Sequence, residues 1–154
     1  MYISNKIKLE DIKEEKAIFA REDIAKDEII FEFEQKFIDH PTRDSLQVDE
    51  GKHQVSSKRD ATENFINHSC SPNGYIDFSD MTFRALKKIT KGEEITFNYN
   101  TTEWDMANGF ECFCGEKNCL KKIKGFRYLN CEQRKKLKGK LSPFLKKKYQ
   151  KECR

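Results

Sequence analysis

Residues 64–73 read Asn-Phe-Ile-Asn-His-Ser-Cys-Ser-Pro-Asn, and they say more about the fold than any other stretch of this 154-residue chain. The two apolar residues, Phe65 and Ile66, are expected to pack in the interior. Asn67 and His68 follow directly, and they would present polar groups at a place where two segments of the chain cross. Cys70 then adds a thiol, a side chain that binds soft metal ions.

Two later segments sharpen this interpretation. Residues 92–99 read Gly-Glu-Glu-Ile-Thr-Phe-Asn-Tyr, and three cysteines then follow at positions 112, 114 and 119. Each segment alone is a moderate signal, but all three in this order and at this separation are a strong one. Together they resemble the SET-domain protein-lysine methyltransferases that carry a cysteine-bearing post-SET segment. The resemblance covers residues 15–129.

The resemblance implies a mostly β fold, in which small curved sheets surround a pseudo-knot and a zinc-tied segment and C-terminal helices follow. It divides the chain into a SET domain at 1–110, a post-SET zinc segment at 111–129 and a basic helical tail at 130–154. The implied activity is transfer of methyl groups from S-adenosylmethionine to the ε-amine of a lysine in a protein substrate. The expected product is di- or trimethyl-lysine, and the expected cofactors are S-adenosylmethionine and zinc.

Several residues match positions that bind cofactor, line the substrate channel or act in catalysis in the family. The resemblance implies that the Asn67 side chain holds the methionine part of the cofactor and that the His68 backbone holds the adenine. It makes Tyr99 the catalytic tyrosine, which also borders the cofactor, and gives Phe97 a place in the substrate channel, where it influences how many methyl groups are added. The backbone of three early residues completes the cofactor site: Lys16, Ala17 and Ile18.

The cysteine run has the spacing of a metal site. Cys112, Cys114 and Cys119 lie within eight positions, which favours metal binding over a disulfide framework in a chain without a secretion signal. A structural zinc site needs four ligands, and the fourth could be Cys70, Cys131, Cys153 or a histidine. The resemblance selects Cys70, and Cys131 and Cys153 stay unassigned thiols.

Trp104, the only tryptophan, lies between Tyr99 and the cysteine run. It is expected either to wall the substrate channel, where aromatic faces stabilise an ammonium group, or to anchor the core. The chain also departs from the family pattern in two places. Glu15-Lys16-Ala17 replaces the early Gly-x-Gly, and residues 42–45, Thr-Arg-Asp-Ser, lack the tyrosine that many relatives carry there.

These departures support an alternative function, a degenerate, non-catalytic SET module that binds a protein partner. A third class is a small zinc-dependent nucleic-acid binder, which would need base-stacking aromatics interleaved with basic residues. The tail aromatics at 126, 128, 144 and 149 suit packing better. Cofactor binding separates the third class from the first two, and turnover separates the methyltransferase from the degenerate module.

Charge is distributed unevenly along the chain. Residues 1–120 hold 16 Lys and Arg against 24 Asp and Glu, whereas residues 121–154 hold 14 against 2. The acidic body would attract a lysine-rich substrate, and the basic tail would meet an acidic partner or nucleic acid, or simply keep the chain in solution. The absence of a long apolar run and of a signal core predicts an intracellular protein, cytoplasmic or nuclear, without a membrane contact. The chain is expected to be a monomer.

Short strands rich in β-branched and aromatic residues are expected over most of the chain, at 16–20, 28–33, 44–48, 74–78, 82–86 and 94–97. Gly92 is expected in the turn before the last of these. Residues 20–30 and 85–95 echo one another, and both are expected to form strand, turn and strand. Helices are expected only in the tail, with Asn130 and Ser142 as their caps.

Overall fold

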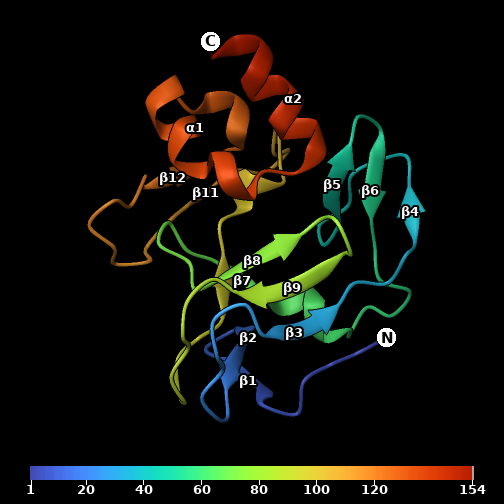
Figure 1. The fold of residues 1–154 in the computed structure, drawn as a ribbon, viewed down its shortest axis with the longest axis vertical. Helices are drawn as coiled ribbons and strands as arrows, with labels where there is room; N and C mark the ends of the chain where they lie inside the picture. The colour runs from blue at the N-terminus through green and yellow to red at the C-terminus, as the bar shows by residue number, and fades with distance from the viewer. Residues whose placement is uncertain (154) are drawn as a thin grey trace.

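The computed structural model describes residues 1–153 of the chain as small sheets with two helices at one end (Figure 1). The N-terminal hairpin lies at the opposite end, and a three-stranded sheet lies between them. The helices are α1 (Cys131–Leu137) and α2 (Pro143–Glu152). The strands are β1 (Ile7–Ile12), β2 (Glu15–Ala20), β3 (Ile29–Glu32), β4 (Phe37–Ile38), β5 (Leu46–Asp49), β6 (Lys52–Gln54), β7 (Asn67–His68), β8 (Gly74–Asp77), β9 (Thr82–Ala85), β10 (Thr96–Phe97), β11 (Phe110–Glu111) and β12 (Lys122–Ile123).

The sheets are small and largely antiparallel. They have the orders β1–β2, β3–β9–β8, β4–β6–β5 and β11–β12, and the pair β10–β7 is parallel. The predicted mostly β fold is therefore confirmed. The strands β1, β4, β6, β7, β11 and β12 were not predicted from the sequence, although β1 largely alternates apolar and polar residues as a half-buried strand does.

The two echoing segments pair with one another as the halves of a local two-fold. Ile24 and Ile89 form the central bridge, with hydrogen bonds of 2.9 and 3.0 Å in both directions. The Ala20 amide donates to the Glu93 carbonyl at one end, and the Ala85 amide donates to the Glu28 carbonyl at the other. Both turns use a positive φ, 64° at Asp27 and 91° at Gly92, so similar turns selected similar residues.

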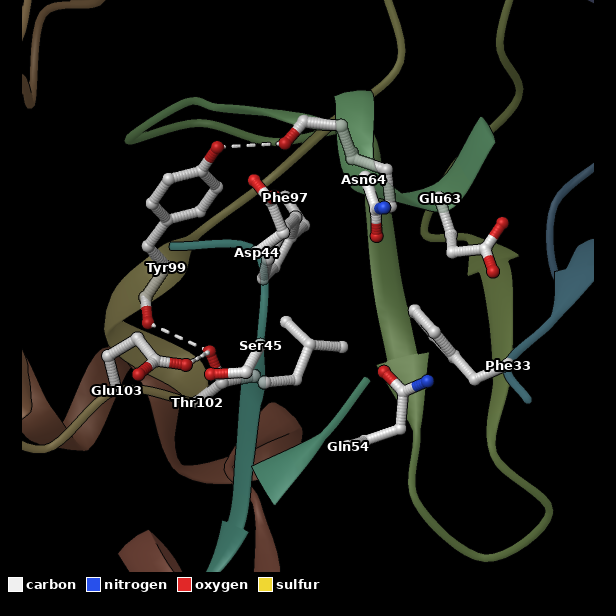
Figure 2. Close-up of a pocket in the computed structure, with 12 residues that line it drawn as sticks. Phe33, Asp44, Ser45, Gln54, Glu63, Asn64, Phe97, Tyr99, Thr102 and Glu103 are labelled. Atoms are coloured by element: carbon white, nitrogen blue, oxygen red, sulfur yellow. Dashed lines mark hydrogen bonds between the residues drawn. The ribbon is translucent and has the colours of Figure 1, made fainter. Parts of the chain in front are cut away.

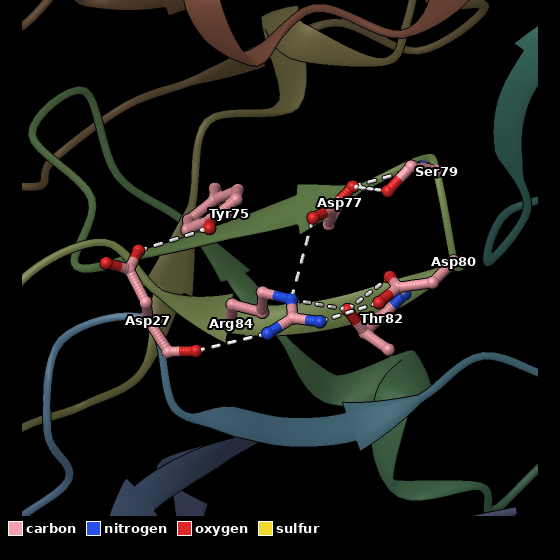
Figure 3. Close-up of polar contacts among 7 residues, drawn as sticks. All are labelled: Asp27, Tyr75, Asp77, Ser79, Asp80, Thr82 and Arg84. Carbon is pink, nitrogen blue, oxygen red and sulfur yellow. Dashed lines mark hydrogen bonds and ion pairs between the residues drawn. The ribbon is translucent and has the colours of Figure 1, made fainter.

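The outer face of the β8–β9 hairpin carries a satisfied polar network (Figure 3). The Arg84 guanidinium lies 2.6 Å from the Asp80 carboxylate and 3.6 Å from that of Asp77, and it also donates to the Asp27 carbonyl. The Tyr75 hydroxyl donates to the Asp27 carboxylate across 3.3 Å. These contacts fasten the hairpin to the turn at Asp27, and each exposed pair stabilises the fold only modestly.

Three apolar clusters form the interior of residues 1–153, and the smallest holds Cys70, Cys112 and Ile123. The largest one lies among β1 to β10 and centres on fully buried side chains such as Ile18, Phe31 and Phe83. The second one joins the tail to the rest of the chain, with Phe126, Phe144 and Leu145 buried against Trp104. The tail therefore packs as part of the folded chain.

The tail helices begin where the sequence predicts. Asn130 and Gln133 form a reciprocal capping box at the start of α1, and the Ser142 hydroxyl accepts the Leu145 amide at the start of α2. The Ser142 amide donates to the Thr101 carbonyl across 2.9 Å, which ties α2 to the turn after β10.

Cys131 and Cys153, which had no assigned partner, form a disulfide with their Cα atoms 5.5 Å apart. The bond joins the first residue of α1 to the residue that follows α2. Sequence spacing alone cannot show this proximity. Neither helix has the length or the apolar run needed to cross a membrane.

Candidate functional site

The site is built where β7 and β10 run parallel, the crossing at which the sequence predicts a pseudo-knot. Asn67 pairs with Thr96 and His68 with Phe97, and the Ser69 amide continues the pairing by donating to the Phe97 carbonyl across 3.0 Å. The buried Asn73 side chain reinforces the crossing, because it accepts the Thr96 amide and donates to the Glu94 carbonyl. Two segments distant in sequence are thereby held in one register.

The Asn67 side chain lies between this crossing and β2. Its amide nitrogen donates to the Glu94 carboxylate across 2.9 Å and approaches the Lys16 carbonyl at 3.4 Å. The structure therefore brings Asn67 together with the predicted residues of β2. Ala17 and Ile18 are completely buried, backbone included. Ala17 has a negative φ, which is compatible with the loss of the usual glycine.

His68 connects two parts of the site through its two ring nitrogens. Nδ1 accepts the Tyr99 amide across 3.1 Å, so the ring proton of the neutral imidazole must be on Nε2. Nε2 lies 3.4 Å from the Cys70 sulfur and donates towards it. Burial lowers the pKa of His68 to about 4, which keeps the ring neutral near pH 7.

Tyr99 begins the 3₁₀ turn Tyr99–Thr101 directly after β10. Its hydroxyl donates to the Ile66 carbonyl across 2.8 Å, which leaves its oxygen lone pairs free to accept. Burial, together with nearby acidic groups such as Glu15 and Asp44, raises the pKa of the phenol well above its usual value near 10. Tyr99 therefore stays protonated near neutral pH and cannot serve as a general base there.

A cavity opens beside the Tyr99 ring (Figure 2). The Phe97 ring forms one wall and lies 4.9 Å from the Tyr99 ring, centroid to centroid. Asp44 and Ser45 line the cavity at the place where the sequence lacks the family tyrosine. Polar residues that the sequence did not single out complete the lining, notably Glu63, Asn64, Thr102 and Glu103.

Trp104 is not among the residues that line the cavity beside Tyr99. Its ring packs against Phe126 and Phe144, at centroid distances of 6.4 and 6.3 Å, in the cluster that docks the tail. The backbone turns at Trp104 to meet Gly125, where a Cβ atom would lie 2.5 Å from the Trp104 carbonyl oxygen. Position 125 therefore needs a glycine, because a side chain there would collide with the Trp104 backbone.

The four predicted cysteines converge next to His68. The sulfur atoms of Cys70, Cys112, Cys114 and Cys119 all lie within 4.8 Å of one another, and those of Cys70 and Cys112 are 4.0 Å apart. A tetrahedral zinc site with Zn–S bonds of about 2.3 Å separates its sulfurs by about 3.8 Å, so the cluster is compatible with one zinc ion. Burial raises the pKa of the Cys70 thiol to about 12, so a cation would have to displace its proton.

The chain matches the family model described as the SET domain over residues 15–100. Among curated relatives, it is 46% identical over 63 residues to a methyltransferase, flvH, of Aspergillus flavus, a match that covers 40% of this chain and 35% of that protein. It is 36% identical over 129 residues to a histone-lysine N-methyltransferase of Candida albicans named as specific for lysine 36 of histone H3. That match covers 70% of this chain and 15% of the relative, so the chain spans a minor part of both proteins.

Solved structures share the fold at low identity. The chain of KRYPTONITE, crystallised with methylated DNA and S-adenosylhomocysteine, has a TM-score of 0.61 and 20% identity over 76% of this chain and 29% of its own. The methyltransferase domain of human SETMAR has a TM-score of 0.55 and 17% identity over 75% of this chain and 56% of its own. The family match spans more than half of the residues and contains the whole β7–β10 crossing with Asn67 and Tyr99. The chain is therefore a member of the SET-domain family.

Proposed function

We propose that this chain transfers methyl groups from S-adenosylmethionine to the ε-amine of a lysine in a protein substrate. The observation that carries the proposal is the position of Tyr99. Its hydroxyl lies beside a cavity and next to the β7 crossing, and its proton is already donated to the Ile66 carbonyl. The phenolic oxygen is therefore oriented to accept a hydrogen bond from an amine that enters the cavity.

The residues fit the cofactor that this activity needs. Asn67 offers a side-chain amide at the edge of β2, and the backbone of Lys16, Ala17 and His68 lies around it. S-adenosylmethionine, when bound there, supplies a methyl group on a sulfonium that an amine can displace. The chain contributes alignment, because holding two reactants in line removes much of the entropic barrier.

The acidic body of the chain favours a lysine in a basic segment of the substrate. Asp44 and Glu63 line the cavity, and Asp44 lies in the loop that leads into β5. Charge complementarity of this kind speeds the encounter with a cationic segment. Histone tails are suitable first substrates, and a whole-cell protein extract widens the search.

The first prediction concerns activity. Tyr99→Phe removes the hydroxyl that orients the amine and should lower the rate of methyl transfer by about 100-fold or more. Asn67→Ala should weaken S-adenosylmethionine binding by about 1–3 kcal/mol, since a buried polar partner is lost. Transfer of labelled methyl groups to core histones measures the former, and calorimetry measures the latter.

Tyr128→Phe is the matched control for Tyr99→Phe, because Tyr128 is exposed and its hydroxyl donates to Asp105 on the surface. It should keep wild-type activity. If Tyr99→Phe turned over as fast as the wild type, or if Asn67→Ala bound the cofactor with unchanged affinity, the proposed site would be wrong.

We also propose that Cys70, Cys112, Cys114 and Cys119 hold one zinc ion. The proximity of their sulfurs supports this, as do the donors around Cys70, namely His68 Nε2 and the Leu120 amide at 3.4 Å. Such outer contacts orient metal ligands and favour the thiolate form. The metal would fasten the segment after β11 to the end of β7.

The second prediction is one zinc per chain. Cys70→Ser and Cys112→Ser should each lower the bound zinc well below one equivalent, because three thiolates hold the ion less tightly than four. Metal analysis of the purified proteins measures the number of zinc ions bound per chain. Cys153→Ser is the control, because this sulfur is bonded to Cys131 and lies outside the cluster, and it should keep its zinc. Full zinc content in the Cys70 and Cys112 variants would reject this ligand set.

The third prediction concerns the product. Phe97 is buried against Phe83 and Tyr99 and brings no hydroxyl to the cavity. Space at this place lets a methylated amine rotate and accept a second or third methyl group. Phe97→Tyr should place a hydroxyl or a water there and shift the product towards monomethyl-lysine. Mass spectrometry of modified lysines measures the ratio.

Phe113→Tyr, at an exposed position, should leave the product ratio unchanged. Wild-type protein that makes only monomethyl-lysine, at long times and with saturating cofactor, would contradict the predicted di- or trimethylation.

The basic tail is proposed to be a packing element first and a docking surface for an anionic partner second. Lys148 lies over the Trp104 ring at 4.9 Å and Lys140 over the Tyr75 ring at 3.4 Å, so some tail cations serve the fold. Lys135 and Lys136 on α1 are exposed, and within residues 1–153 they make no ion pair. These two lysines are suited to meet DNA or an acidic peptide.

The fourth prediction separates these roles. Leu145→Ala should lower the free energy of unfolding by about 2–5 kcal/mol, because Leu145 is fully buried. The double variant Lys135→Gln, Lys136→Gln should unfold like the wild type but elute earlier from immobilised duplex DNA or polyglutamate as salt is raised. Unchanged stability of Leu145→Ala, or unchanged elution of the double variant, would contradict the corresponding role.

A further inference from the structure

A second cavity lies where the tail meets the rest of the chain, and it shares no lining residue with the cavity beside Tyr99. Its volume is about 310 Å³, at the lower end of the range for small-ligand sites. One side is formed by the loop after β7, the start of β8 and the residues that follow β9. The other side is formed by the end of α1 and the 3₁₀ turn Lys138–Lys140.

The charged side chains that line this cavity are all cationic. Lys87 follows β9, whereas Lys136 and Lys140 belong to the tail. Among the described residues, no aspartate or glutamate lines the cavity. Within residues 1–153, none of these lysines forms an ion pair. Like charges around one space repel each other, so an anion that entered the cavity would be attracted from several sides.

Lys140 is held by an aromatic ring at the edge of the cavity. Its ammonium nitrogen lies 3.4 Å from the centroid of the Tyr75 ring, which is a cation–π contact. The Tyr75 hydroxyl donates to the Asp27 carboxylate across 3.3 Å and so fixes the ring. An ammonium group has three N–H donors, and a single ring face satisfies only part of them. Lys140 therefore keeps donors for a ligand.

Asn98 adds a neutral donor from a third direction. The residue is 5% exposed, caps the turn Tyr99–Thr101 and lines this cavity. Its Oδ1 accepts the Asn100 amide across 3.0 Å, which fixes the orientation of the side-chain amide. Nδ2 donates to no group within residues 1–153 and is not sealed from solvent. The free atom of Asn98 is therefore a donor, which suits an anion.

The nature of the lining distinguishes between classes of anion. Lysines near the C-terminal end of a helix complement its dipole, but Lys87 lies on no helix and Asn98 carries no charge. A carboxylate brings one charge and two oxygens. A phosphate monoester near pH 7 brings a charge of about −1.5 to −2 and three strong acceptor oxygens. A phosphate therefore suits a space that has several cations and a separate amide donor around it.

We propose that this cavity binds a phosphate dianion, either inorganic phosphate or the terminal group of a small phosphate monoester. Lys87 and Asn98 hold it from the body of the chain. Lys136 and Lys140 hold it from the tail, so the bound anion fastens the tail to the body. The site is separate from the proposed methyl transfer, and its binding is measured without turnover.

Calorimetric titration of the full chain with inorganic phosphate, at an ionic strength held constant with chloride, tests the site. The wild type should bind one phosphate per chain. Lys87→Gln should fold like the wild type, because Lys87 is exposed, and should bind phosphate about tenfold more weakly, because a cation beside the anion is lost. Wild-type protein that binds no phosphate at millimolar concentration would overturn the proposal.

Lys88→Gln is the matched control. It removes the same charge one position along the chain, but Lys88 pairs with Asp23 and lies outside the cavity. Its affinity for phosphate should stay within about twofold of the wild type, since a distant exposed charge is screened by salt. Equal affinities of Lys87→Gln and Lys88→Gln would mean that phosphate senses only the net charge, and they would overturn the proposal.

Asn98→Asp tests the neutral donor. A carboxylate oxygen can still accept the Asn100 amide, so the turn keeps its cap, but the donor is replaced by a negative charge. Phosphate binding should be lost. A melting temperature near that of the wild type establishes that the variant is folded, and wild-type affinity in the folded variant would remove Asn98 from the site.

Two further probes distinguish the source of the phosphate. Phenyl phosphate that binds at least as tightly as inorganic phosphate assigns the site to a monoester, and weaker binding assigns it to the free ion. A short DNA duplex tests a phosphodiester backbone as the alternative. If Lys87→Gln weakens duplex binding in a protein that binds neither inorganic phosphate nor phenyl phosphate, the cavity serves the DNA backbone and the proposal is wrong.

Discussion

The parallel pairing of β7 with β10 is the constraint on which the rest of this structure depends. Two short segments, 67–68 and 96–97, hold one another in register, and the Asn73 side chain ties the loop after β7 to Glu94 and Thr96. Every part of the proposed site starts from one of these segments. Asn67 projects from β7 towards β2, the cysteine cluster begins two residues after His68, and Tyr99 and the cavity follow β10 directly. A shift of one residue in this register would separate the tyrosine from the Ile66 carbonyl that orients it.

His68 shows how the crossing couples functions that lie on different segments. Nδ1 accepts a hydrogen bond from the Tyr99 backbone amide, and Nε2 donates towards the sulfur of Cys70. The imidazole therefore holds the start of the tyrosine turn and a proposed metal ligand at a fixed separation. The Ser142 amide adds a second tie, because it donates to Thr101 and connects α2 to the same turn. The tail, the cysteine cluster and the cavity are thus parts of one packed assembly.

Turns and helix starts were predictable from the sequence, whereas contacts between residues distant in the sequence were only partly predictable. The turn at Gly92, the capping box at Asn130 and the helix start at Ser142 follow from residues within four positions of one another. The prediction that Cys70 joins Cys112, Cys114 and Cys119 came from a family resemblance, because the spacing of the cysteines alone left the fourth metal ligand open. The contacts of Glu94 and Glu103 were missed because glutamate is common on protein surfaces, and only the fold places one beside Asn67 and the other at the cavity next to Tyr99. The disulfide of Cys131 and the packing of Trp104 depend on where the tail helices dock.

In this account, one strand crossing makes the proposed zinc site and the proposed cofactor site interdependent. Calorimetric titration of S-adenosylmethionine into zinc-loaded protein, chelator-treated protein and protein with zinc restored tests it most directly. The account predicts that removing the metal weakens cofactor binding by about 10-fold or more, as loss of ordered groups around a metal site typically does, and that zinc restores it. An unchanged Kd in protein that has lost its zinc, by metal analysis, would contradict the claim.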